Sequence, residues 1–595
     1  MKFIRTLLVF TFFYSCTIFS QIDFSEEIKV SELEEHVKYL ASKECAGRKP
    51  GTEGDKLAAA YIKQQLENSV LLPQAENGFQ YFDVTTSIST GTNNSFNYNN
   101  FTGTIDNDFT PLSISGNGSL KSNVVFVGYG FDFENDSLKW HDYADLDVTG
   151  KWVMILRGSP DSDKHNDRFE NYSGLRKKAM IAKDNKAAGV LFVSGEKFDK
   201  DDNLVVTANS KRESSIELPA IQIKRSHADK ILENAEVTIS ELETHYSEEM
   251  IPFSFELETV VDASAEIIEN KVKTQNVSFY LEGSDPILKN EIVILGGHFD
   301  HLGMGGPGSG SREPDNNVIH YGADDNASGV ATIIELMERL SLNKNYIKRS
   351  ILMIAFSGEE MGLLGSKYFT NNPFIDLKNV KCMLNFDMVG RLDEDSQSIS
   401  LGGTGTAKEY DLIIDDLLTK SELKVSKSPQ GYGPSDHASF YALDIPVLFF
   451  FTGIHDDYHT SRDTPDKCNF EGQKLVSDFA YDLITQVANY GSSLTFQEAG
   501  PKTRDTGKRK FKVTLGIMPD VSGTETTGLR VDAVMDGRPA KNAGMQKGDV
   551  IIGMEGKEVK DIYDYMNRLS DFKVGQRITV EVLRDGKKIL LITEL

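Results

Sequence analysis

Hydrophobic residues along the chain change their spacing several times, and each spacing predicts a different kind of element. Near the start they recur every three or four positions, which is typical of helices with one buried face, and two such helices are expected over residues 30–40 and 54–66. From about 120 to 250, short apolar runs typical of strands take over, interrupted by one helix over 175–188. We therefore expect a helical start followed by a β-rich module.

Between residues 255 and 495, near-continuous apolar strands alternate with amphipathic helices. The four expected strands are 292–295, 351–356, 382–386 and 447–451, and two of the expected helices are 331–340 and 475–487. This alternation predicts an α/β fold with a buried, mostly parallel sheet, because a strand that is apolar on both faces needs a layer of helices on each side.

Composition marks the breaks between these regions. Residues 91–119 are rich in Asn, Ser, Thr and Gly, which predicts loops or a domain boundary. A polar, basic stretch over 502–510 precedes a final segment of about 85 residues, which has short strands and one helix near 563–569. A chain of 595 residues is too long for a single hydrophobic core, so several domains are expected.

Unusual polar side chains follow the strands of the 255–495 region at their carboxyl ends. They are His298 and Asp300, Glu359 and Glu360, Asp387, and His459. Ligands of an open parallel sheet bind beyond the carboxyl ends of its strands, so we expect these side chains to meet at one edge. Six of the eleven histidines fall between 298 and 459, which favours one binding centre over scattered structural histidines.

The chemistry of this set points to metal ions. Two imidazoles with several carboxylates and no cysteine suit Zn²⁺, with Mn²⁺ or Co²⁺ as alternatives. Asp325 opens a helix and could bridge two ions. Three carboxylates would offset three of the four positive charges of two divalent ions, which leaves room for one bridging hydroxide. Two such ions together lower the pKa of that water and polarise a carbonyl group.

Glu359 and Glu360 need different roles, because neighbouring side chains cannot both point at one ion. We expect Glu360 to bind metal and Glu359 to act as the general base, which takes the proton of the attacking water and passes it to the leaving amine. Asp300, two residues after His298, suits an acceptor that fixes the tautomer of that imidazole.

Five motifs follow one another through this region. They are Gly297-His298-Phe299-Asp300-His301, Asp325-Asn326-Ala327-Ser328-Gly329, Gly358-Glu359-Glu360-Met361-Gly362, Asn385-Phe386-Asp387-Met388-Val389-Gly390-Arg391 and Tyr458-His459-Thr460. In this order they resemble the motifs of the secreted dizinc aminopeptidases, the zinc exopeptidases that also include glutamate carboxypeptidase. The resemblance covers about residues 25–90 and 255–495.

The resemblance implies two zinc ions per chain and a role for each motif. One zinc would be held by His298, Asp325 and Asp387, and the other by Asp325, Glu360 and His459, with Asp325 bridging. It also implies Glu359 as the general base and Tyr458 as a hydrogen-bond donor to the tetrahedral oxyanion. His437 and Arg391 are candidate substrate-binding residues, since both lie in segments that match the family.

Residues 95–252 are expected to form an inserted domain. Val125-Phe126-Val127-Gly128-Tyr129-Gly130 and Ala187-Ala188-Gly189-Val190-Leu191-Phe192 resemble a protease-associated domain, which would shape access to the site or pack inertly. The catalytic domain would then be discontinuous, over 21–94 and 253–498.

The last segment resembles a PDZ domain, expected over 510–595 after a linker at 499–509. Leu515, Gly516 and Ile517 match the loop that binds a peptide carboxylate, and residues 540–552 match the central signature. Such domains capture a peptide as an added strand, so a protein or peptide C-terminus is an expected partner.

The first 20 residues are expected to be an export signal. Lys2 and Arg5 precede an apolar run, Ser20-Gln21 offers a cleavage point, and the run is too short to span a membrane. The exported protein would be periplasmic, at the cell surface or secreted, with a lipid anchor at Cys16 as the alternative. A formal net charge of −25 disfavours nucleic acid and anionic membrane surfaces as partners.

The expected function is the hydrolytic removal of N-terminal residues from peptides. A carboxypeptidase would need a basic pocket for the substrate carboxylate, and only Arg391 and Arg462 lie beside the ligand motifs. A glutaminyl cyclase of the same fold works with one zinc, whereas all five ligand positions are filled here. A non-catalytic peptide-binding protein is the alternative from a different class.

Overall fold

The computed structural model describes most of the chain, in two compact units. The described residues are 27–67, 70–134, 138–162, 167–170, 172–207, 215–500, 502, 513–519, 527–534, 537–560 and 562–595. One unit comprises Met1–Phe82 and Thr274–Gly500, and the other comprises Asp83–Lys273 and Pro501–Leu595. The expected export signal and most of the expected linker at 499–509 lie outside the described residues.

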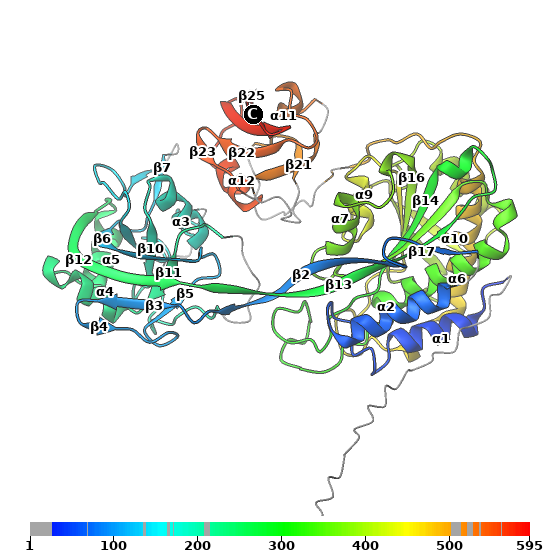
Figure 1. Ribbon diagram of the computed structural model, residues 1–595, viewed down its shortest axis with the longest axis horizontal. Coiled ribbons are helices and arrows are strands. Elements are labelled where there is room, and N and C mark those ends of the chain that lie inside the picture. The colour runs from blue at the N-terminus through cyan, green and yellow to red at the C-terminus, as the bar shows by residue number, and fades with distance from the viewer. Residues whose placement is uncertain are drawn as a thin grey trace, which may run out of the picture. The chain divides into compact units, whose positions relative to one another are not determined.

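The first unit contains a mixed sheet with a parallel centre (Figure 1), and because it carries the residues expected to be catalytic we refer to it as the catalytic unit. Its four central strands are β15 (Ser350–Phe356), β14 (Ile292–His298), β16 (Val380–Phe386) and β19 (Val447–Phe451), and each neighbouring pair of them is parallel. The flanking strands are β1 (Leu72–Pro73), β2 (Phe79–Thr90), β13 (Ile267–Leu281), β17 (Ser398–Gly402) and β18 (Lys424–Lys427). β13 and β17 join the central strands antiparallel, so the expected parallel sheet is confirmed in its centre and mixed at its sides.

Helices cover both faces of this sheet, because the central strands are apolar on both faces. On β14, Val293 and Leu295 face a core shared with α1 (Val30–Leu40), α2 (Glu53–Leu66), α6 (Gly329–Leu342), α8 (Tyr410–Leu418) and α10 (Phe470–Asn489). Ile292 and Ile294 face the opposite core, shared with α7 (Leu364–Asn371) and α9 (His437–Tyr441). Alternate residues of one strand thus enter two cores, as the period of two in a strand requires.

The insert in the second unit contains an eight-stranded sheet with three helices. Its strands are β3 (Ser95–Tyr98), β4 (Phe101–Thr102), β5 (Phe109–Pro111), β6 (Gly118–Phe126), β9 (Trp152–Leu156), β10 (Gly189–Val193), β11 (Ala220–Ile223) and β12 (Phe255–Ala265), beside a separate pair, β7 (Asp132–Glu134) and β8 (Lys139–His141). The single expected helix is α3 (Leu175–Asp184).

The expectation of one helix in the insert was wrong, since two more follow it. They are α4 (Arg225–Leu232) and α5 (Ile239–Glu249), and α5 begins with a capping box between Thr238 and Glu241. Both helices are short and mostly polar: α4 buries Ala228, Ile231 and Leu232, and α5 buries three apolar residues, so few positions mark them in the sequence.

The C-terminal segment of the second unit has its own core. Its described elements are β20 (Ile517–Pro519), β21 (Leu529–Val534), α11 (Pro539–Asn542), β22 (Val550–Met554), β23 (Lys557–Glu558), α12 (Ile562–Leu569), β24 (Arg577–Arg584) and β25 (Lys587–Glu594). Of the expected carboxylate loop, Leu515 is buried, Gly516 has a left-handed φ of 72°, and Ile517 opens β20.

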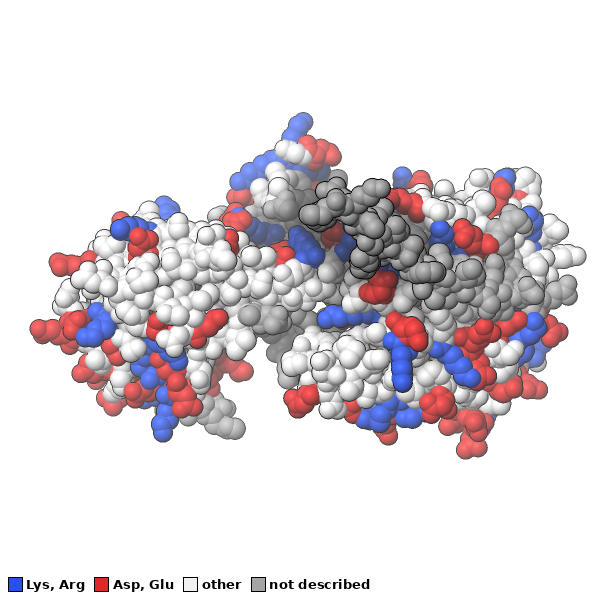
Figure 2. Space-filling model, turned by 60° about the horizontal axis from the view of Figure 1, so that its bottom comes forward, with Lys and Arg blue, Asp and Glu red and all other residues white. Residues whose placement is uncertain are grey.

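The described helices include none with the length and apolarity needed to cross a membrane. Acidic and basic side chains are interspersed on the face shown in Figure 2.

Candidate metal centre

The residues expected to bind metal meet at the carboxyl edge of the parallel strands. His298 is the last residue of β14, Glu360 follows β15, and Asp387 follows β16 directly. Asp325 lies in the short segment before α6, and His459 lies in the loop beyond β19. Five separate chain segments thus deliver one ligand each, which is why no short stretch of sequence contains the whole centre.

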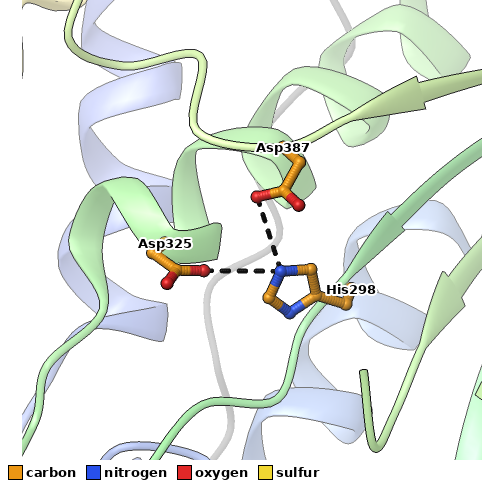
Figure 3. A group of neighbouring side chains, drawn as sticks. All are labelled: His298, Asp325 and Asp387. Carbon is orange, nitrogen blue, oxygen red and sulfur yellow. Dashed lines mark ion pairs between the residues drawn. The ribbon is translucent and has the colours of Figure 1, made fainter. Parts of the chain in front are cut away.

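His298 forms the first half of the centre with two carboxylates (Figure 3). Its Nε2 lies 3.4 Å from Asp325 Oδ1 and 3.5 Å from Asp387 Oδ1. All three residues are buried, with Asp387 the most exposed at 9%, so their charges interact with little screening by water.

His459 forms the second half and shares Asp325 with the first. Its Nε2 lies 3.3 Å from Asp325 Oδ2 and 3.1 Å from Glu360 Oε2. The two oxygens of Asp325 therefore face two different imidazoles, which is the arrangement that a carboxylate bridging two ions requires.

The other nitrogen of each imidazole faces a backbone carbonyl. His298 Nδ1 lies 3.2 Å from the carbonyl oxygen of Asp300, and His459 Nδ1 lies 3.1 Å from that of Gly310. A proton on each Nδ1 can be donated to these carbonyls, which leaves both Nε2 atoms with a lone pair for metal.

The carboxylate of Asp300 faces His298 and also binds two backbone groups. It lies 3.7 Å from His298 Nδ1, farther than the carbonyl of the same residue. Its Oδ1 accepts the backbone N–H of Glu359 at 3.0 Å, and its Oδ2 accepts that of Glu360 at 3.4 Å. Asp300 thus holds the turn that carries both glutamates.

This donor set fits zinc. Ligand atoms about 2.0–2.2 Å from a tetrahedral zinc ion lie roughly 3.3–3.6 Å from one another. The four distances across the centre run from 3.1 to 3.5 Å. Buried carboxylates also need balancing positive charge. Burial alone would lower the pKa of His459, yet Asp325 and Glu360 raise it to about 11, a measure of how strongly the site attracts a cation.

Glu359 and Tyr458 lie at the edge of this donor set. Glu359 Oε2 is 3.9 Å from His298 Nε2. Burial, with the charges of Glu360 and other nearby acids, raises the pKa of Glu359 well above its usual value although His298 opposes the shift. The Tyr458 ring stacks on His459, with centroids 3.8 Å apart.

The two candidate substrate-binding residues are placed less directly. Arg391 Nη2 lies 3.2 Å from Asp463 and 3.5 Å from Asp457, so its charge is already paired. His437 is buried, its ring stacks on Phe449, and burial lowers its pKa to about 3. A substrate role for either residue stays a prediction.

Two buried polar residues that were not expected hold the ligand segments together. Asn326 donates to the carbonyl of Phe386 at 2.9 Å and accepts the N–H of Met388 at 3.1 Å, which ties the Asp325 segment to the end of β16. Asp463 Oδ2 accepts the N–H groups of Asp324 at 2.9 Å and of Asp325 at 3.0 Å. Their positions one residue after Asp325 and four after His459 were the only clues in the sequence.

Arg48 supports the same centre from the N-terminal segment. Its guanidinium is fully buried and donates to four carbonyl groups, those of Leu40, Phe299, Tyr321 and Gly322, at 2.6 to 2.8 Å. Phe299 follows His298, and Gly322 precedes the segment of Asp325. The turn containing Arg48 is therefore part of the frame of the site.

Comparisons with known proteins agree with the order of segments along the chain. Residues 276–484 match Peptidase family M28, residues 120–231 match the PA domain, and residues 508–595 match the PDZ domain.

The curated relatives are named as leucine aminopeptidases. A probable leucine aminopeptidase of Arthroderma otae is 30% identical over 233 residues, which are 37% of this chain and 61% of that protein. Leucine aminopeptidase 1 of Sclerotinia sclerotiorum is 30% identical over 217 residues, 34% of this chain and 54% of that protein. The chain thus spans about three fifths or less of the length of these relatives.

Among solved structures, the chain is similar to a zinc aminopeptidase from Bacillus subtilis. The two are 17% identical, with a TM-score of 0.42, and the comparison covers 80% of this chain and 100% of that chain. The family matches fall on the segments described above. Residues 276–484 therefore carry the likeness to Peptidase family M28, and the segments at 120–231 and 508–595 carry those to the PA domain and the PDZ domain.

Proposed function

We propose that the protein is a zinc-dependent aminopeptidase that removes N-terminal residues from peptides with two zinc ions per chain. The observation that carries the proposal is the position of Asp325, whose two oxygens face His298 and His459 separately. One ion would be held by His298, Asp325 and Asp387, and the other by Asp325, Glu360 and His459. The names of the curated relatives support the same activity.

The chain's own groups divide the remaining work. Zinc bound here would lower the pKa of a water molecule and polarise the peptide carbonyl. Glu359, beside His298, takes a proton from the attacking water and returns it to the leaving amine. Tyr458, stacked on His459, is placed to donate its hydroxyl proton in a hydrogen bond to the oxyanion.

Charge favours a free amino terminus over a free carboxylate as the group that is recognised. Both arginines beside the ligand motifs are already paired: Arg391 with Asp463, and Arg462 with Glu313 and Asp457. The surplus of carboxylates instead suits a substrate ammonium group. Neither arginine is therefore available to bind the C-terminal carboxylate that a carboxypeptidase recognises.

The remaining parts of the chain have proposed roles outside the chemistry. Residues 1–20 would direct export, and the catalytic domain would comprise 21–94 and 253–498. The insert at 95–252 would shape access to the centre, and the domain at 510–595 would bind a peptide C-terminus. N-terminal sequencing of the exported protein tests the first of these roles.

Zinc content and substrate choice test the proposed activity together. We expect two zinc ions per purified chain, with hydrolysis of leucyl and other aminoacyl p-nitroanilides but not of their N-acetylated forms. Activity on N-blocked peptides with a free carboxylate would indicate a carboxypeptidase. One zinc ion with cyclisation of N-terminal glutamine would indicate a glutaminyl cyclase, and a chain that binds no zinc would refute the proposal.

A further inference from the structure

His301 lies inside the centre but has no role in the ligand set described above. It follows Asp300 in the segment after β14, and only 1% of its surface is exposed. The ring packs so closely on Gly322 that a Cβ placed on that glycine would lie 2.6 Å from its Cγ. Neither ring nitrogen makes a hydrogen bond of regular geometry to a described residue. A buried imidazole with two such nitrogens is costly unless it serves the site.

The nearest polar atom to this imidazole belongs to a metal ligand. His301 Nδ1 lies 2.8 Å from Glu360 Oε1, whereas Asp325 Oδ2 is 3.8 Å away. The other oxygen of Glu360, Oε2, lies 3.1 Å from His459 Nε2. The carboxylate of Glu360 is therefore held between two imidazoles, each facing a different oxygen.

The distances separate the roles of these two imidazoles. Between His459 and its carboxylates they are 3.1 and 3.3 Å, near the separation expected for two ligands of one zinc ion. The contact between His301 Nδ1 and Glu360 Oε1 is 2.8 Å, shorter than that separation, although neither atom has a hydrogen bond of regular geometry. His459 thus has the spacing of a metal ligand, and His301 has the spacing of a side chain that holds a ligand in place.

We propose that His301 is a positioning residue for the second zinc ion, which holds Glu360 by Oε1 so that Oε2 turns to the metal. The other oxygen of Glu360, Oε2, then stays beside His459 Nε2 for the ion that these two residues would share. This inference rests on the proposed function, because it requires a second ion beside Glu360 and His459. It adds a second imidazole to that half of the centre, where His298 alone serves the first half.

The proposal predicts how much zinc affinity depends on His301. Residues that orient metal ligands typically change metal affinity by about 10- to 100-fold when they are replaced. The effect should fall mainly on the second ion, since His301 lies 2.8 Å from Glu360 but 3.8 Å from Asp325, the ligand that the two ions would share. The first ion, bound through His298, is then an internal reference within the same molecule.

The test compares two substitutions that differ in one property. His301→Leu fills the space without a donor, whereas His301→Asn places an amide N–H near the position of Nδ1 but is a poor zinc ligand. His459→Ala shows what loss of a true ligand of the second ion does. His320→Asn is the matched control, since His320 is fully buried nearby and bonds Ser311 rather than a metal ligand.

Zinc bound per chain is measured by mass spectrometry after equilibration of the full-length protein at a series of buffered free zinc concentrations. We expect His301→Leu to weaken the second ion about 10- to 100-fold, and His301→Asn and the control to bind nearly as the unchanged protein does. If His301→Asn loses the second ion as completely as His459→Ala, His301 is a direct ligand and the positioning role is wrong.

Two other results also overturn the inference. If His301→Leu binds two ions with unchanged affinity, His301 has no part in the site and the proposed function stands without it. If the unchanged protein binds fewer than two ions, the proposed function and this inference fail together. Circular dichroism of the His301→Leu protein checks that it is folded. If His301→Leu is unfolded but His301→Asn is folded, the zinc affinity of His301→Asn alone decides whether His301 is a direct ligand or a positioning residue.

Discussion

Replacing Glu338 with glutamine should stabilise the catalytic unit by an amount that grows with pH. Glu338 lies on α6, is 1% exposed, and neither of its carboxylate oxygens has a hydrogen-bond partner among the described residues. Burial, with the nearby charges of Glu335 and Glu32, raises its pKa to about 9, while Lys29 opposes the shift. The side chain is therefore a neutral acid in the folded protein at neutral pH.

The sign and size of the effect follow from proton linkage. An unfolded glutamate titrates near its ordinary value of 4.5, so between that value and about 9 the folded state holds one proton more than the unfolded state. The favourable contribution of this proton is complete below pH 4.5 and is lost as pH rises towards 9. The loss is about 1.4 kcal/mol per pH unit, or roughly 2.7 kcal/mol between pH 6 and pH 8. Glutamine keeps the shape without the titration.

The assay is thermal unfolding of the zinc-loaded full chain at pH 6, 7 and 8, followed by calorimetry and by tryptophan fluorescence. The difference in Tm between Glu338→Gln and the unchanged protein should widen with pH, by roughly 2–4 °C for each kcal/mol. Both tryptophans, Trp140 and Trp152, lie in the other unit, so their transition provides a control that should not move. Glu34→Gln, at a partly exposed acid of α1, is the control for the loss of one carboxylate elsewhere in the same unit. A Tm difference for Glu338→Gln that is independent of pH would refute the reasoning.

Four further changes test other parts of the structure. Glu359→Gln should retain zinc but hydrolyse substrate about 10²-fold more slowly or worse. Near-normal turnover of a variant that still binds zinc would show that Glu359 is not the general base. Asp325→Ala should lower the amount of zinc bound at both halves of the centre in a metal assay, because the two halves share this side chain. Loss of only one ion would contradict the bridging role. Arg48→Lys should lower the unfolding free energy of the catalytic unit by about 1–3 kcal/mol, since lysine cannot serve four carbonyl groups, and an unchanged Tm would contradict this. Deletion of 505–595 should leave hydrolysis of a small aminoacyl substrate intact, because no proposed ligand lies there; an inactive but folded product would contradict the independence of that segment.

The sequence was most informative where one physical rule decided the structure. The strands after which the ligands lie are apolar on both faces, so their position and their parallel pairing could be predicted. The meeting of His298, Asp387 and His459 then followed from the common edge at which parallel strands end. These rules act over a few residues and do not depend on the rest of the fold.

The residues that the sequence did not reveal depend on contacts between distant segments. Arg48 lies about 250 residues from the carbonyl of Phe299 that it binds, and Asp463 is 138 residues from Asp325. His301 stands inside a recognised motif, yet its contact with Glu360 depends on how two loops pack. The hydrogen bonds of the Asp300 carboxylate were missed for the same reason, because they join it to backbone groups that no spacing rule identifies.

The two strands that lead into and out of the insert have a consequence for how such a chain can be assembled. Gln80 and Asn276 are hydrogen-bonded at 3.1 Å, and Thr86 and Asn270 at 3.1 Å, so β2 and β13 run antiparallel with Phe82 opposite Thr274. The path of the catalytic chain is therefore interrupted at two points that are already neighbours. A domain of any size can enter or leave there while the ends that it joins stay in place, as in a hairpin whose loop is exchanged. This geometry leaves the chain open to the exchange of its insert at one position, and a short turn from β2 to β13 should be enough to restore an uninterrupted domain.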